Sequence, residues 1–219
     1  MCATRRETDA LCRQIDTALT LLQKDRLQDA LIHLVIAVNA VSGQGGRSIK
    51  DWLARKTQLI SMFLLGGRGF SNVRVPHFPI QGRLKKPDEF GTVSLQDALY
   101  HLFRNPLVHE AQLPPQIQDE PKPNRLPYYD GEKEVFHVHL QNLIAGLMVA
   151  LLTQVPSECS SKISGSLSNY PLANFCGLSE KDALALLRAF FPEHPDMTGA
   201  SLCFCKQIPS ESEIQSSEE

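Results

Sequence analysis

The sequence predicts an all-α protein with four to five core helices, and three observations support this fold class. Apolar residues recur at the three- and four-residue spacing of a helix in several separate stretches. Serine residues suited to capping a helix precede three of these stretches. The most apolar run, residues 143–152, is about half as long as a membrane span and therefore fits a buried helix. With 219 residues, of which 42% are hydrophobic, the chain can bury a sizeable core.

Two helices are expected near the amino terminus. Leu11, Ile15 and Leu22 follow the spacing of one helical face. The second helix is expected from about residue 25 to residue 41, and apolar residues surround it almost completely. A helix of this kind packs against several neighbours, so we expect it to be central.

The next two helices are expected to begin at serine caps. Ser48 is followed three residues later by Asp51, as in a capping box, and the glycine pair 66–67 is expected to close this helix. Ser94 and Asp97 repeat the pattern and predict another helix start.

The remainder of the chain is expected to be less regular. Short strands are expected near residues 73–80 and 134–138, and an apolar helix is expected over about residues 140–155. Composition then divides the chain into a helical domain, residues 1–155, an extension, residues 156–208, and a disordered acidic tail, residues 209–219. Ser179 is expected to cap one helix in the extension, which otherwise has the composition of a linker up to residue 176.

Charge and cysteine content narrow the function classes. The formal net charge of −2 excludes a polycation that binds nucleic acid or anionic membranes with its whole surface. Six cysteines without a regular spacing indicate reduced thiols, and the amino terminus lacks an apolar run of signal-peptide type. We therefore expect a cytoplasmic protein that does not associate with membranes.

One long connection is strongly basic. Between residues 66 and 87 the chain carries five cationic residues and no acidic residue. Such a loop is either simply solvated or attracts phosphate groups. The five cationic residues are Arg68, Arg74, Arg83, Lys85 and Lys86.

The segment from Arg104 to His109 carries the residues best suited to chemistry. Pro106 is expected to interrupt the preceding helix, because proline lacks a backbone donor and clashes with the turn before it. Asn105 would then cap a new helix whose free amides attract anions. An arginine can bind a phosphate through two donors, and an imidazole can exchange protons near neutral pH. Together these groups suit the binding and cleavage of a phosphodiester.

The run from Tyr100 to Glu110 resembles the signature of the HEPN (higher eukaryotes and prokaryotes nucleotide-binding) superfamily. That signature is an arginine, a polar residue directly after it, a few further residues, and a histidine. Arg104, Asn105 and His109 occupy these positions. The resemblance covers about residues 10–155. Pro106 is unusual at its position in this pattern.

The resemblance implies a helical bundle that forms a homodimer and places two motifs in one RNA cleft. Many such proteins are metal-independent endoribonucleases of toxin–antitoxin, defence or RNA-processing systems, some with an antitoxin or regulatory partner. Carried over, His109 is the acid/base residue, Arg104 stabilises the transition state, and Asn105 assists. Attack by a ribose 2′-hydroxyl leaves a cyclic phosphate. Tyr100, Glu110 and the five basic loop residues are candidates for substrate contact, and no metal or cofactor is implied.

Two other functions remain open. A protein of this fold can be a non-catalytic module that recognises a nucleotide or a protein partner. Alternatively, the chain is a helical interaction protein in which Arg104 and His109 are structural, for example through a contact with Glu110.

Other candidate sites have simpler interpretations. His137 and His139 could ligate a metal, but a half-buried strand that leads into a helix explains them as well. His33 lies among apolar residues and fits a core histidine with a hydrogen-bond partner. Cys203 and Cys205 are two ligands at most, too few for a zinc site.

Overall fold

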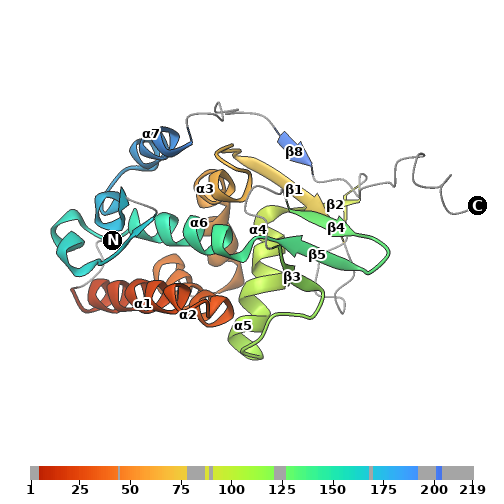
Figure 1. The fold of residues 1–219 in the computed structure, drawn as a ribbon, viewed down its shortest axis with the longest axis horizontal. Coiled ribbons are helices and arrows are strands. Elements are labelled where there is room, and N and C mark those ends of the chain that lie inside the picture. The colour runs from red at the N-terminus through yellow and green to blue at the C-terminus, as the bar shows by residue number, and fades with distance from the viewer. Residues whose placement is uncertain are drawn as a thin grey trace, which may run out of the picture.

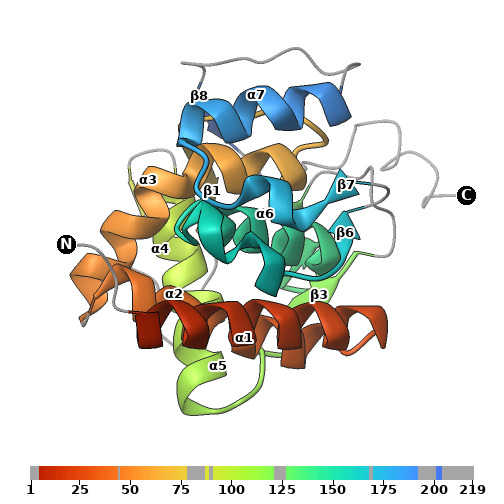
Figure 2. The same cartoon turned by 90° about the vertical axis from the view of Figure 1, so that its left-hand side faces the viewer.

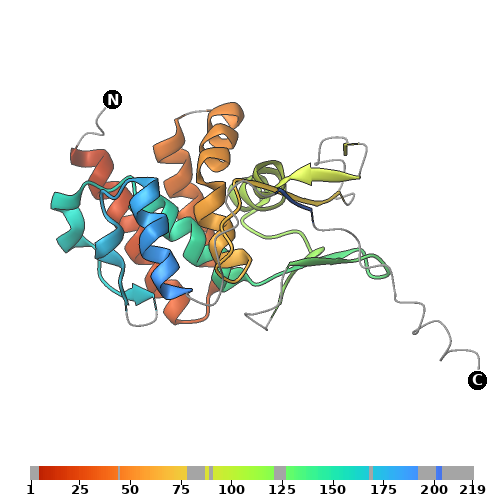
Figure 3. The same ribbon diagram turned by 90° about the horizontal axis from the view of Figure 1, so that it is seen from above.

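A computed structural model shows a mostly helical protein with a few short strands. It describes residues 5–43, 45–77, 87–88, 91–120, 127–167, 170–191 and 201–203. Helices gather at one end of the molecule, and most strands lie at the other end (Figure 1, Figure 3). The longer helices are α1 (Arg5–Gln23), α2 (Leu27–Ser42), α3 (Gly46–Leu64), α6 (Leu140–Leu152) and α7 (Glu180–Phe190).

Helix α6 forms the centre of the core. Every one of its residues from Leu143 to Leu152 is buried, and it packs against α2 and α3. Helix α7 lies on one side of α6 and α1 on the other (Figure 2). Gly146 lets α6 lie directly against the backbone of α3, because a Cβ atom there would lie 3.0 Å from both the Cα and the carbonyl oxygen of Ile60. No helix in the described part of the chain is both long and apolar enough to cross a membrane.

The strands form two three-stranded sheets and one hairpin. In the first sheet, β1 (Asn72–Pro76) lies between β2 (Thr92–Ser94), its antiparallel neighbour, and β8 (Ser201–Cys203), its parallel neighbour. In the second sheet, β5 (Val135–Val138) lies between its parallel neighbour β3 (Ile117–Asp119) and its antiparallel neighbour β4 (Tyr128–Asp130). The hairpin pairs β6 (Ser166–Leu167) with β7 (Tyr170–Pro171). The strands expected near residues 73–80 and 134–138 are confirmed as β1 and β5, and residues 78–80 of the first region lie outside the described residues.

Two of the three expected serine caps are confirmed. The side-chain oxygens of Ser94 and Ser179 accept hydrogen bonds from the backbone N–H groups of Asp97 and Asp182, at 3.3 and 3.2 Å. The prediction for Ser48 is wrong, because α3 begins two residues earlier, at Gly46. Gly45 has a φ of 111°, a left-handed value that glycine adopts without strain, so this turn into the helix depends on backbone freedom instead of a side-chain cap.

The expected helix break at Pro106 is also wrong. Helix α4 (Leu95–Ala98) continues through a π-helical turn, η1 (Leu99–Arg104), directly into α5 (Asn105–His109). Asn105 has helical φ and ψ angles and donates its N–H to the carbonyl of Tyr100, five residues back, so it is not a cap. A π-helical turn is wider than an α-helical one and often occurs at functional sites. It accommodates the proline ring without ending the helix.

The segment after Pro156 packs onto the helical core, although its composition resembles a linker. It forms two 3₁₀ helices, η2 (Ser157–Lys162) and η3 (Leu172–Phe175), and the side chains of Leu172 and Phe175 are fully buried. Burial raises the pKa of the Cys176 thiol to about 11, so this thiol stays protonated at neutral pH and behaves as an apolar side chain. The expected tail, residues 209–219, lies outside the described residues.

Candidate functional site

The motif, residues Arg104, Asn105 and His109, lies on the α4–η1–α5 helix, which contacts α2. Near the start of α2, the Gln28 side chain exchanges hydrogen bonds with the backbone of Ala111 and Leu113, each of 3.2 Å. Near the end of α2, Asn39 contacts Arg104. These two contacts fix α5 beside α2 and place the motif at the edge of the helical bundle (Figure 1).

Arg104 is half-buried, and the chain itself holds its guanidinium. Its Nε donates to Oδ1 of Asn39 at 3.1 Å, and its Nη1 donates to Oδ1 of Asn105 at 2.9 Å. The guanidinium carbon lies 5.4 Å from the centre of the Tyr100 ring. Nη2 has no hydrogen-bond partner among the described residues. The arginine is therefore oriented by three neighbours and keeps one nitrogen for a ligand.

His109 is exposed at the end of α5, and its ring has no hydrogen-bond partner among the described residues. It makes no direct contact with Arg104 in the structure. Asn105 connects them, because it bonds Arg104 and lies one α-helical turn before His109. Residues four apart on a helix share a face, and helical side chains lean towards the amino terminus. The amide of Asn105 and the imidazole of His109 thus lie on one face.

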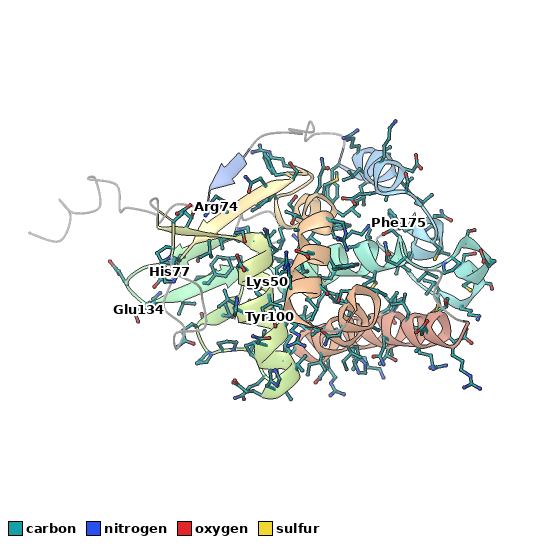
Figure 4. The ribbon with its side chains drawn as sticks, turned by 180° about the vertical axis from the view of Figure 1, so that it is seen from behind. Lys50, Arg74, His77, Tyr100, Glu134 and Phe175 are labelled. Atoms are coloured by element: carbon teal, nitrogen blue, oxygen red, sulfur yellow. The ribbon has the colours of Figure 1, made fainter. Side chains whose placement is uncertain are left out.

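A second set of polar side chains adjoins the motif. Lys50, on α3, lies 2.6 Å from Oδ1 of Asp97 and 2.9 Å from Nε2 of His101, and its Nζ is 4.9 Å from the centre of the Tyr100 ring. Figure 4 shows Lys50 and Tyr100 side by side. An ammonium group only donates, so His101 accepts through Nε2.

The Tyr100 ring therefore contacts two cations, one from α3 and one from the motif. Sequence reasoning missed Lys50 and Asn39, since each is a single polar residue in an otherwise ordinary helical pattern and only the packing of three helices brings them to the motif.

The two described cations of the basic loop, Arg68 and Arg74, are not brought together with the motif. Arg74 forms an ion pair of 2.5 Å with Asp88 and a hydrogen bond of 2.8 Å with Thr92, so a carboxylate just beyond the loop neutralises its charge. Figure 4 shows Arg74 on β1, in the part of the molecule that holds most strands and apart from Tyr100. Arg68 is exposed.

The other candidates for substrate contact are three loop cations and Glu110. Arg83, Lys85 and Lys86 lie outside the described residues. Glu110 is exposed directly after His109, and its backbone N–H donates to the carbonyl of Pro106 at 2.7 Å. Of the candidates for substrate contact, Tyr100 and Glu110 adjoin the motif.

The three other histidines considered from the sequence have structural contacts. His137 stacks on the Tyr128 ring, with ring centres 4.6 Å apart. His139 is buried and caps α6 by accepting from the backbone N–H of Asn142 at 3.1 Å. His33 is half-buried and lies 2.7 Å from the side chain of Gln14. Among the described residues, no three histidine, cysteine or acidic side chains form a group that could hold a metal ion.

Comparison with known proteins places the chain in one family. Residues 10–179 match the model of the family described as Rv1289. This stretch reaches from α1 to the residue that caps α7, so it includes the whole motif and both of its supporting helices. No curated protein and no solved structure matches the chain.

Proposed function

The chain belongs to the Rv1289 family, and we propose that it is a metal-independent endoribonuclease of the HEPN type. The observation that carries this proposal is the hydrogen bond of 2.9 Å between Nη1 of Arg104 and Asn105. This bond ties the guanidinium to the helix face that also carries the exposed imidazole of His109. A phosphodiester on this face would meet a fixed positive charge and a group that exchanges protons near neutral pH.

The reaction follows from the chemistry of these side chains. His109 takes the proton from a ribose 2′-hydroxyl, and the 2′ oxygen attacks the adjacent phosphorus. Arg104 stabilises the negative charge that develops on the phosphoryl oxygens. The bond from phosphorus to the 5′ oxygen breaks, and a second imidazole donates a proton to that oxygen. The products carry a 2′,3′-cyclic phosphate and a 5′-hydroxyl.

A second copy of the chain would supply this second imidazole as its own His109. Ile36 and Val108 are 42% and 40% exposed, and they are the two large hydrophobic residues most exposed in the described part of the chain. Ile36 lies one helical turn before Asn39, and Val108 lies one turn after Arg104, so both adjoin the contact between Asn39 and Arg104. Exposed apolar residues next to a polar site suit a dimer interface.

The proposal is tested with purified protein, single-stranded RNA and a chelator. We expect the protein to be a dimer by light scattering and to produce fragments with cyclic phosphate ends. Val108→Glu buries a charge in the proposed interface, so it should give a monomer that no longer cleaves. Ala185→Glu, on the exposed face of α7, is the control and should cleave as the wild type does. RNA that stays intact with the dimeric wild-type protein would refute the proposed activity.

One observation favours a second candidate function, a non-catalytic module that binds nucleotides or RNA. Two of the three nitrogens of the Arg104 guanidinium are already engaged by Asn39 and Asn105. A guanidinium held in this way suits recognition of a phosphate at least as well as stabilisation of a reaction. Binding that depends on Arg104 without any cleavage would support this module.

A further inference from the structure

An open pocket lies next to the motif, between α3 and the α4–η1 helix. Its volume is about 550 Å³. Tyr100 forms part of its wall, and the same ring lies 5.4 Å from the Arg104 guanidinium. The pocket and the arginine of the motif are thus separated by the thickness of one aromatic side chain. If a phosphate of a nucleic acid strand is bound at Arg104, the next nucleotide of that strand would reach the pocket.

The position of Tyr100 depends on a glycine at the start of α3. A Cβ atom on Gly46 would lie 2.5 Å from the Tyr100 hydroxyl oxygen and 3.0 Å from the ring carbon that carries it. Any other residue at this position would move the ring or the helix. Gly46 therefore lets Tyr100 pack directly against the backbone of α3, where it stands between the pocket and Arg104.

One ion pair forms a neutral part of the pocket lining. Lys50 and Asp97 line the pocket and lie 2.6 Å apart, with their side chains 19% and 20% exposed. The Ser94 hydroxyl donates to the other carboxylate oxygen of Asp97 at 2.8 Å. Because their charges are matched within the protein, these two residues shape the pocket without giving it a net charge.

Two further charged residues of the lining are exposed. Arg47 and Asp51 lie one turn apart on α3, a spacing at which an ion pair often forms. Neither forms an ion pair with a described residue. The pocket therefore offers a guanidinium, a carboxylate and the side of an aromatic ring. A ligand that suits all three has a negative group, a hydroxyl donor and a flat ring.

We propose that this pocket binds the ribonucleotide next to the phosphate held by Arg104. Arg47 binds the phosphate of this nucleotide, and Asp51 accepts a hydrogen bond from its ribose 2′-hydroxyl. The base lies beside Tyr100. The contact with the 2′-hydroxyl makes the pocket selective for RNA over DNA. This inference rests on the proposed function, because it takes the substrate at Arg104 to be a nucleic acid strand.

The test measures binding of labelled single-stranded RNA, and of DNA with the same sequence, by fluorescence anisotropy. A parent protein with His109→Ala keeps the RNA intact. In this parent, Arg47→Ala should raise the Kd for RNA about tenfold, the usual effect of losing a hydrogen bond to a charged group. Ala54→Trp fills the pocket from an exposed position and should have a similar effect. Arg55→Trp adds the same bulk on an exposed neighbour outside the lining and should change Kd less than twofold.

Asp51→Leu tests the selectivity. It should weaken RNA binding and leave DNA binding unchanged, so that the ratio of the two Kd values falls towards one. Parent-like RNA binding by both Arg47→Ala and Ala54→Trp, or no RNA binding by the parent, would overturn the inference. Cleavage by the wild type without any effect of the pocket variants would refute only the pocket. If the pocket variants change RNA binding but the wild type does not cleave RNA, only the proposed nuclease activity is refuted.

Discussion

Replacing His109 by alanine is expected to lower the rate of RNA cleavage by about 10²–10⁴-fold, the usual contribution of a positioned acid/base group. Arg104→Ala is expected to lower the rate by about 10²–10³-fold, because the developing charge on the phosphoryl group loses its fixed donor. Both rates are measured in chelator as single-turnover cleavage of end-labelled RNA. Neither change should alter the helical content, since His109 is exposed and Arg104 is half-buried.

Two controls separate chemistry from damage to the fold. Added imidazole should partly restore cleavage by His109→Ala, and it should not restore cleavage by Arg104→Ala. Arg13→Ala removes an exposed arginine from α1 and should leave the rate unchanged. Cleavage at the wild-type rate by His109→Ala would show that the imidazole is not the acid/base group.

Replacing Gly146 by valine is expected to cause the largest loss of stability, about 2–3 kcal/mol. A Cβ atom at this position already lies 3.0 Å from the Ile60 backbone, so the added methyl groups must push α6 away from α3. Valine forms helices better than glycine, but that gain is below about 1 kcal/mol and does not offset the clash. Thermal or urea unfolding measures the change.

Gly131→Ala is the control for this prediction. The added Cβ would lie 3.9 Å from the nearest atom, in the Tyr129 ring, which is an ordinary contact distance. We expect its free energy of unfolding to stay within about 0.5 kcal/mol of wild type, as for most surface changes. If Gly146→Val proved as stable as Gly131→Ala, the close packing of α3 and α6 would be wrong.

Periodicity and capping predicted most of the helical framework. The apolar run around Leu143 indicated the central helix, and Ser94 and Ser179 indicated two helix starts, because these signals depend only on neighbouring residues. The predictions of a cap at Ser48 and of a helix break at Pro106 were wrong. Helix α3 begins after Gly45, whose backbone adopts a left-handed φ, and a π-helical turn accommodates Pro106. Both features depend on backbone geometry, which side-chain preferences do not predict.

The sequence predicted only the part of the candidate site that lies on one helix. Arg104, Asn105 and His109 follow from a local pattern, but the partners that orient them come from α2 and α3. Asn39 lies 65 residues before Arg104, and Lys50 lies 47 residues before Asp97. Such pairs depend on how helices pack, which hydrophobic periodicity leaves undetermined. The same limit applies to the exposed residues Ile36 and Val108, which come to one site only because α2 packs against α5.

Contact between the Arg104 guanidinium and an RNA phosphate is the central claim, and the salt dependence of RNA binding tests it most directly. Anisotropy titrations over a series of salt concentrations compare His109→Ala with the double variant that also carries Arg104→Ala. The loss of one phosphate contact on a single strand should reduce the slope of log K against log salt by about 0.7, together with a weaker affinity. Identical slopes and affinities for the two proteins would contradict the claim.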